Sequence, residues 1–204
     1  MNIRMKWNLN DFTKFGFANL LKPFEGSIDD VIKITRAFGI ATKAHRGQFT
    51  KENSVEPYIN HPLRVALILT EELSIHDVDL VCAAFLHDTI EKSHSNTISE
   101  EQLREEFGEQ VYNIVHTITK PRARDEEKGK VLNEYFQIIA KSSEAIRYVK
   151  LADRLDNIRT LKNTFHKDKA LRYKEETQRY VIPIAKKTDE KLVFKLSVAL
   201  YELK

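Results

Sequence analysis

The sequence predicts an all-α protein. Glycine and proline are scarce, with 6 and 5 residues among 204, which leaves few turns for a sandwich or a barrel. Apolar residues recur at helical spacing, and potential caps such as Ser27, Ser99 and Ser143 precede several of these stretches. We therefore expect a helical bundle of about 8–10 helices. The length suits one domain, with residues 1–26 as a helical lead-in and residues 27–204 as the main body.

The composition excludes several classes of partner. Acidic and basic residues nearly balance, with a net charge of +3, so DNA and RNA are not expected as partners. No apolar run is long enough to span a membrane, and the N-terminal residues lack the pattern of a signal peptide. The single cysteine, Cys82, has no partner for an intramolecular disulfide, which is typical of a reducing compartment. We expect a cytoplasmic protein, and the sequence does not indicate its oligomeric state.

The first half of the chain contains three expected helices after the lead-in. A helix is predicted over residues 28–46, and a polar loop at 50–56 follows. Proline is favoured at the first position of a helix, so Pro62 predicts that the next helix starts with His61 at its N-terminus. A third helix is predicted from about Asp77 to Glu91.

The second half continues the helical pattern. Ser99 and Gln102 form a predicted capping box for a short helix that ends at Gly108, and the helix after it stops at Pro121. The highly charged segment 121–130 is expected to be a mobile surface loop. The remaining predicted helices are 131–141, a long helix capped by Ser143, 167–187 and 189–203.

Ionisable side chains interrupt the apolar sequence of the helix predicted at 77–91. In a helix, His87 and Glu91 share a face by their spacing of four, with Asp88 about 100° around the axis. Burying such groups without partners costs several kcal/mol. We therefore expect other parts of the chain to supply partners for them.

Two imidazoles and two carboxylates form a candidate metal site, made of His61, His87, Asp88 and Asp153. This mixture of ligands suits Mn²⁺ or Fe²⁺, with Zn²⁺ as a further alternative. A divalent metal lowers the pKa of a bound water and polarises a phosphoryl oxygen. Glu91 would then orient or deprotonate that water.

Simpler structural roles stay open from the residues alone. A buried histidine is usually a hydrogen-bonded core residue. Asp153 and the following Arg154 are compatible with an ordinary ion pair on a helix surface. Asn157, one turn after Asp153, is a candidate for holding a substrate group beside the metal.

Several short words in this order resemble the HD superfamily of metal-dependent phosphohydrolases, and within it the hydrolase domain of RelA/SpoT-type alarmone enzymes. The words are Ala44-His45-Arg46-Gly47-Gln48, Pro57-Tyr58-Ile59-Asn60-His61-Pro62, Ala84-Phe85-Leu86-His87-Asp88-Thr89-Ile90-Glu91, Phe107-Gly108, Thr117-Ile118-Thr119-Lys120 and Lys150-Leu151-Ala152-Asp153-Arg154-Leu155-Asp156-Asn157-Ile158-Arg159. The resemblance covers about residues 28–185. The chain has no room for a synthetase domain, so it is most similar to the stand-alone small alarmone hydrolases.

The resemblance implies an HD-domain helical bundle and an Mn²⁺-dependent enzyme. Such an enzyme removes the 3′-pyrophosphate of (p)ppGpp and leaves GDP or GTP. The implied metal ligands are His61, His87, Asp88 and Asp153. Glu91 is implied to position the attacking water, and Asn157 to contact the ribose or the 3′-phosphate. Lys51 and Arg46 are implied to face substrate phosphate.

The chain departs from the family pattern at two places. The family usually has Glu-Asp where this chain has Glu91-Lys92, and it usually has an arginine where this chain has Thr50. A lysine cannot share the water as a carboxylate does, although it can bind phosphate, so Lys92 is an atypical member of the catalytic pair. Two alternatives follow. One is the same chemistry on another nucleotide, such as an adenosine analogue of the alarmone or NADPH. The other is a degenerate domain that binds nucleotide or a partner protein without turnover.

Overall fold

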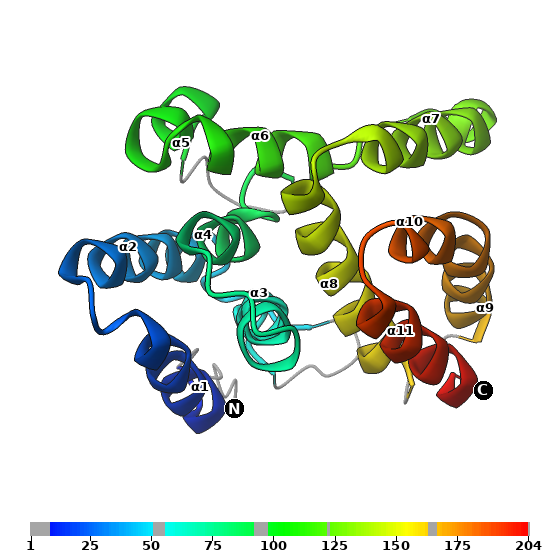
Figure 1. Cartoon of the computed structure of the whole chain (residues 1–204). Coiled ribbons are helices and arrows are strands. Elements are labelled where there is room, and N and C mark those ends of the chain that lie inside the picture. The colour runs from blue at the N-terminus through cyan, green and yellow to red at the C-terminus, as the bar shows by residue number, and fades with distance from the viewer. Residues whose placement is uncertain (1–8, 51–55, 92–97, 122, 163–166, 204) are drawn as a thin grey trace, which may run out of the picture.

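The computed structural model describes residues 9–50, 56–91, 98–121, 123–162 and 167–203. Within these residues the chain forms helices α1 to α11, and its extended pairing is limited to one isolated bridge between Phe49 and Pro57 (Figure 1). The helices α9 and α10 follow one another without a loop. The prediction of an all-α bundle of about 8–10 helices is therefore confirmed.

Helices α1 to α4 occupy the first half of the chain. Their bounds are Asp11–Leu21, Ile28–Ala44, Asn60–Leu67 and Val78–Leu86. The side chains of Asn10, Ser27 and Asp77 accept backbone N–H groups at the starts of α1, α2 and α4. These bonds satisfy donors that the first turn of a helix leaves unpaired.

Helices α5 to α11 form the second half. Their bounds are Glu100–Phe107, Glu109–Ile118, Lys128–Lys141, Glu144–Leu161, Lys167–Glu176, Ile182–Lys186 and Glu190–Glu202. Both hydrogen bonds of the capping box predicted for Ser99 and Gln102 are present. Gly108 has a φ of 90° between α5 and α6, a backbone conformation that glycine adopts without steric cost.

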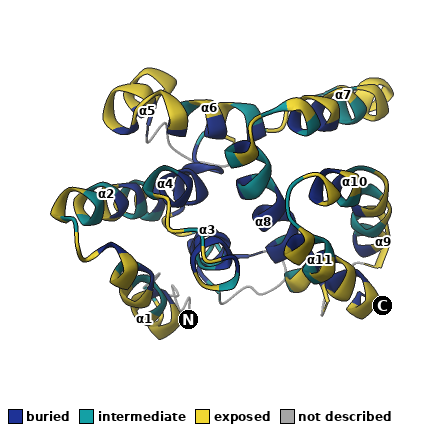
Figure 2. Cartoon of the chain, in the orientation of Figure 1, coloured by how far each residue is buried: buried dark blue, intermediate teal, exposed yellow. Residues whose placement is uncertain are grey.

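The two helices α4 and α8 form the centre of the molecule. Every residue of α4 from Leu80 to Leu86 is buried, and α4 packs against α2, α3, α6 and α8. In turn, α8 also packs against α3, α7, α9 and α11 (Figures 1 and 2). Cys82 is buried in α4, and this burial raises the pKa of its thiol to about 12. The middle of the bundle is therefore the place where segments distant in sequence meet.

The N-terminal helix α1 packs against α3. A Cβ atom at Gly16 would lie 3.1 Å from Leu63 Cδ2, so glycine permits this close approach. The ring of Phe17 stacks on that of Phe38 in α2, with centroids 4.0 Å apart. The Thr13 hydroxyl donates to Asn60 Oδ1 over 2.6 Å, which connects α1 to the first turn of α3.

The prediction of a helix that reaches Glu91 is wrong, because α4 ends at Leu86. The His87 ring donates from Nδ1 to the carbonyl of Ala84 over 2.7 Å. The Thr89 hydroxyl donates to the carbonyl of Leu86 over 2.6 Å. Side chains thus occupy carbonyls that a continuing helix would use, and residues 87–91 form turns. His87 and Glu91 do not share a helix face.

Three other boundaries differ from the predictions. The helix α3 begins at Asn60, so Pro62 is its third residue. Within the segment 121–130, a short 3₁₀ turn at Asp125–Glu127 leads directly into α7. The helix predicted at 167–187 contains a π-helical turn, Thr177–Val181. Pro183 follows it and lacks an N–H, so an uninterrupted α-helical hydrogen-bond pattern cannot pass through this position.

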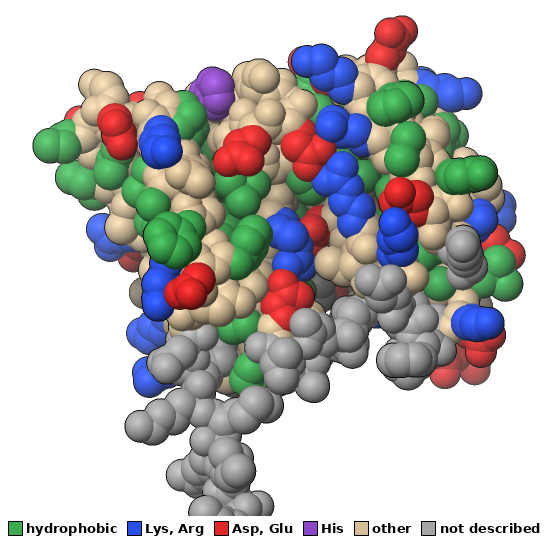
Figure 3. Space-filling view, turned by 90° about the horizontal axis from the view of Figure 1, so that it is seen from below, with side chains coloured by type: hydrophobic (Ala, Val, Ile, Leu, Met, Phe, Trp, Pro, Cys, Tyr) green, Lys and Arg blue, Asp and Glu red, His purple; other side chains and the backbone are tan. Residues whose placement is uncertain are grey.

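Charges of both signs are mixed on the molecular surface. On the face shown in Figure 3, basic and acidic side chains lie among one another, and neither sign gathers into a large patch. Among the described helices, none combines the length and the apolar character that crossing a bilayer requires.

Candidate metal centre

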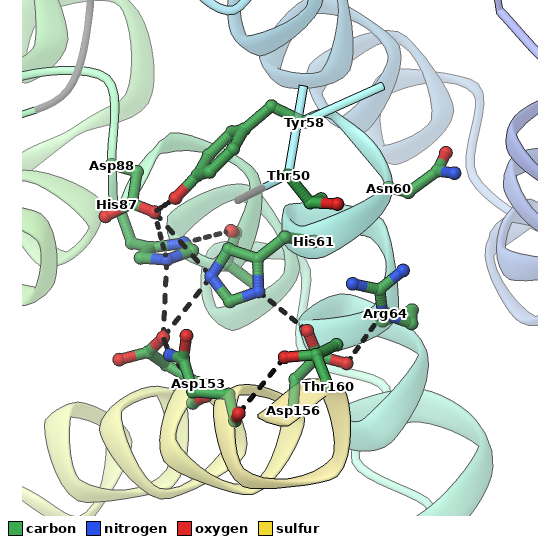
Figure 4. A network of polar contacts seen from close by, with 12 residues as sticks. Thr50, Tyr58, Asn60, His61, Arg64, His87, Asp88, Asp153, Asp156 and Thr160 are labelled. Atoms are coloured by element: carbon green, nitrogen blue, oxygen red, sulfur yellow. Dashed lines mark hydrogen bonds and ion pairs between the residues drawn. The ribbon is translucent and has the colours of Figure 1, made fainter. Parts of the chain in front are cut away.

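Three helices bring the predicted ligands together at the centre of the bundle (Figure 4). His61 lies in the first turn of α3, His87 and Asp88 follow the end of α4, and Asp153 lies in α8. One ligand atom from each of His61, His87 and Asp88 lies within 4.8 Å of the others. Asp153 Oδ1 lies 3.3 Å from His61 Nε2 and 3.8 Å from His87 Nε2.

Both histidines turn the same ring nitrogen toward the cluster. His61 Nδ1 hydrogen-bonds Asp156 Oδ2 over 2.7 Å, and His87 Nδ1 donates to the Ala84 carbonyl. The Nε2 atoms of both rings are buried and have no hydrogen-bond partner among the described residues. A buried polar atom without a hydrogen bond is costly. Two such nitrogens facing carboxylates therefore fit a divalent cation between them.

The two carboxylates of the cluster are also held in place. The Tyr58 hydroxyl donates to Asp88 Oδ2 over 2.6 Å. Lys150 Nζ donates to Asp153 Oδ2 over 2.9 Å, and the Asn157 amide donates to the same carboxylate. Fixed ligands of this kind preserve the geometry of a metal site.

The ion pair considered for Asp153 and Arg154 is absent, although both residues are described. The Arg154 guanidinium instead pairs with Glu176 Oε2 at 3.1 Å. Asp153 is 7% exposed and faces the histidines. The Asp153 carboxylate thus pairs with Lys150 and faces His61, and Arg154 is not its partner.

Electrostatics make the cluster attractive to positive charge. Burial opposes protonation of His61, but the hydrogen bond to Asp156 and the negative charges of Asp153 and Asp156 outweigh it and raise the pKa of His61 to about 9. Burial alone would raise the pKa of Asp153, whereas Lys150 and His61 hold it well below the ordinary value. The carboxylates thus stay ionised, and without a metal they retain a proton on His61.

A cleft opens directly beside the cluster. It is lined by His87, Asp88, Glu91, Ile118, Lys120, Tyr135, Phe136, Lys150, Asp153, Arg154, Asn157, Tyr173 and Glu176. Glu91 is exposed in this cleft, and its Oε2 accepts the backbone N–H of Lys120 over 3.2 Å. The cleft therefore combines the predicted Glu91 and Asn157 with three cationic side chains, Lys120, Lys150 and Arg154.

The residues predicted to face substrate phosphate have different outcomes. Arg46 is exposed and is not among the side chains that line the cleft. Lys51 and Lys92 lie outside the described residues. Thr50 is buried, and its backbone N–H donates to the Glu56 carbonyl over 2.9 Å at the base of the predicted loop.

Sequence reasoning missed the residues that support the ligands, which include Tyr58, Lys150 and Asp156. Arg64 Nε donates to Asp156 Oδ1 over 2.7 Å, behind His61. A spacing of three residues places His61 with Arg64 on one face of α3. This spacing could have indicated that Arg64 lies near His61, because residues three apart are neighbours on a helix.

The family of the chain agrees with a helical bundle built around this cluster of histidines and aspartates. A family model described as HD domain matches residues 37–189 of the chain. An HD domain implies a divalent metal, in agreement with the clustered His61, His87 and Asp88.

Two relatives of similar sequence indicate a more specific group within the HD-domain proteins. The chain is 39% identical over 133 residues to the guanosine-3′,5′-bis(diphosphate) 3′-pyrophosphohydrolase MESH1 of Xenopus tropicalis, which is 65% of this chain and 72% of that protein. It is 40% identical over 151 residues to the guanosine-3′,5′-bis(diphosphate) 3′-pyrophosphohydrolase of Haemophilus influenzae, covering 72% of this chain but 21% of the relative. The chain thus spans about a fifth of the length of that bacterial relative.

The fold agrees with these relatives. A solved structure described as a metazoan ortholog of SpoT that hydrolyses ppGpp matches with a TM-score of 0.73 and 28% identity, over 83% of this chain and 94% of that chain. The chain belongs to the HD-domain family of guanosine-3′,5′-bis(diphosphate) 3′-pyrophosphohydrolases.

Proposed function

We propose that this protein is a metal-dependent phosphohydrolase that removes the 3′-pyrophosphate of (p)ppGpp to give GDP or GTP and pyrophosphate. The observation that carries the proposal is the pair of buried Nε2 atoms of His61 and His87, which face Asp88 and Asp153 without a hydrogen-bond partner. The names of the relatives support the substrate, and they do not favour the adenosine or NADPH alternatives.

The proposed metal ligands are His61, His87, Asp88 and Asp153. Mn²⁺ is the proposed ion, and Fe²⁺ and Zn²⁺ are alternatives, because imidazoles mixed with carboxylates suit all three. When bound, a divalent ion supplies an acidic water and a Lewis acid for the phosphoryl oxygen.

The side chains of the cleft have proposed roles in the same reaction. Glu91 positions and deprotonates the attacking water, and Asn157 contacts the ribose or 3′-phosphate. Both line the cleft beside the ligands, which supports these roles. Lys120 and Lys150 supply positive charge opposite a pyrophosphate leaving group, where charge builds up in the transition state. Roles for Arg46, Lys51 and Lys92 stay predictions.

Incubation of Mn²⁺-loaded protein with ppGpp, with pyrophosphate release as the measurement, tests the proposal. We expect turnover by the wild type and loss of turnover with His87→Ala. His116→Ala is the matched control, since His116 is exposed on α6 and outside the cleft lining. An adenosine analogue and NADPH are assayed in parallel. Faster turnover of either would replace ppGpp as the substrate, and nucleotide binding without turnover would indicate the degenerate domain.

We further propose that residues 27–204 form the hydrolase domain and that residues 1–26 are its lead-in. The match to the family model over residues 37–189 supports this division. The cytoplasmic location expected from the sequence stays a prediction.

A further inference from the structure

A buried carboxylate lies directly behind one of the histidines. Asp156 is 2% exposed and is not one of the side chains that line the cleft. Its Oδ2 contacts His61 Nδ1 at 2.7 Å, and its Oδ1 accepts from Arg64 Nε at 2.7 Å (Figure 4). Each oxygen therefore has its own partner, which fixes the orientation of the carboxylate.

The partner of Asp156 is itself held on its far side. The Arg64 Nη1 atom pairs with Glu56 Oε1, and that oxygen also accepts from the Asn60 amide over 3.2 Å. Asn60 in turn accepts from Thr13 in α1. Arg64 thus bridges two carboxylates, and its guanidinium cannot rotate away from Asp156 without breaking a second contact.

The two candidate histidine ligands are oriented by different acceptors. His87 Nδ1 donates to a backbone carbonyl, that of Ala84, so a side-chain substitution cannot directly remove its acceptor. His61 depends on the Asp156 side chain. A carboxylate behind a metal-bound imidazole fixes its tautomer and increases its basicity as a ligand. His61 is therefore the ligand whose orientation a single substitution can change.

We propose that Asp156 is a positioning residue that keeps the ring proton of His61 on Nδ1 and so presents Nε2 to the metal, with Arg64 and Glu56 holding Asp156 in place. The inference rests on the proposed function only to the extent that this function places a metal at His61. It assigns Asp156 no contact with substrate.

Isothermal titration of metal-free protein with Mn²⁺, in the absence of nucleotide, tests the proposal. Asp156→Asn keeps the size of the side chain but removes its charge and can turn an amide donor toward Nδ1. We expect Mn²⁺ affinity to fall by about 10–100-fold. Glu72→Gln is the matched control, because Glu72 is a carboxylate paired with Arg159 and Lys195 away from the cluster. Its Mn²⁺ affinity should equal that of the wild type.

A spectroscopic measurement separates positioning from general damage to the fold. In protein loaded with diamagnetic Zn²⁺ and labelled with ¹⁵N-histidine, NMR should show the His61 proton on Nδ1 in the wild type. Asp156→Asn should reduce or abolish this signal while His87 is unchanged. If Asp156→Asn does not fold, the variant Arg64→Lys tests the proposal instead. It loses the contact between Arg64 Nε and Asp156 but keeps Asp156 itself, so we expect a smaller loss of Mn²⁺ affinity than for Asp156→Asn.

The outcomes distinguish this inference from the proposed function. Wild-type protein that binds neither Mn²⁺, Fe²⁺ nor Zn²⁺ would overturn both. Wild-type binding together with unchanged affinity and an unchanged His61 signal in a folded Asp156→Asn variant would overturn only the role of Asp156. If Asp156→Asn lost ppGpp hydrolysis but bound metal as the wild type does, this result would count against the positioning role.

Discussion

The charge of His61 depends on what occupies the space in front of its Nε2 atom. In the metal-free protein its pKa is about 9, above the ordinary 6.5, because Asp153 and Asp156 outweigh the effect of burial. At neutral pH a metal must therefore displace a proton from this ring. The same nitrogen cannot hold both.

This competition predicts how metal binding responds to pH. Mn²⁺ binding should release a proton, and the affinity should rise with pH and level off above about 9. Titration calorimetry in buffers of different ionisation enthalpy measures the number of protons released. The range from about pH 6 to about pH 9 spans the ordinary pKa of histidine and the raised pKa of His61. An affinity that does not change across this range would contradict protonation of His61.

The same shift gives a stability prediction for the metal-free protein. A pKa raised on folding stabilises the fold fully below the unfolded value near 6.5. This contribution is lost as the pH rises through about 9. Denaturant unfolding of metal-free protein across this range should show it. His61→Gln should reduce the pH dependence, whereas His116→Gln should leave it unchanged.

Glu91 should affect the rate and not metal binding. We expect Glu91→Gln to lower kcat by about 10²–10⁴-fold, the usual contribution of a general base. Its Mn²⁺ affinity should stay at the wild-type value, because Glu91 accepts a hydrogen bond from the Lys120 backbone and is not one of the proposed ligands. Steady-state kinetics with metal titration tests both statements, and Glu100→Gln, on the exposed start of α5, is the control.

At the scale of the element, caps explain where several helices begin. Ser99→Ala should lower the free energy of unfolding by about 1 kcal/mol, because it removes the capping box of α5. Urea denaturation measures this change. Ser197→Ala should be close to neutral, since Ser197 is exposed within α11 and bonds only the carbonyl of Val193 in its own helix.

The same local signals explain which boundaries the sequence could predict. The caps at Ser27, Ser99 and Ser143 are adjacent to the backbone groups that they bind, so sequence order alone identifies them. The end of α4 depends on His87 and Thr89 binding carbonyls at close range. Those residues are also compatible with a helix, and the apolar pattern continues to Ile90. The choice between the two requires the tertiary structure.

At the scale of the whole molecule, the metal should stabilise the fold. The proposed ligands lie in α3, directly after α4 and in α8, and these helices are packed together only in the folded state. With metal at 100 times its Kd, binding should add about 2.7 kcal/mol to the free energy of unfolding. Thermal unfolding with and without a chelator measures the effect. His87→Ala should make Tm insensitive to chelator.

The sequence could predict that the candidate metal ligands lie close together, but it could not predict the contacts that support them. His61, His87, Asp88 and Asp153 stand out because each is ionisable among apolar neighbours, and the structure brings them together. Asp156 carries the same chemistry, yet only the packing of α8 against α3 shows that it faces His61 and Arg64. The arrangement of hydrogen-bond partners between helices is a property of the complete fold.

The early end of α4 has a consequence for how such an enzyme can evolve. Were residues 87–91 helical, any shift of α4 would move the ligands and Glu91 together. Instead, residues 87–91 form turns, and the Glu91 carboxylate accepts the backbone N–H of Lys120, just after the end of α6. Substitutions near Lys120 can therefore shift the Glu91 carboxylate and alter turnover without replacing a proposed metal ligand. Selection can adjust the speed of the reaction and the demand for the ion as two separate traits.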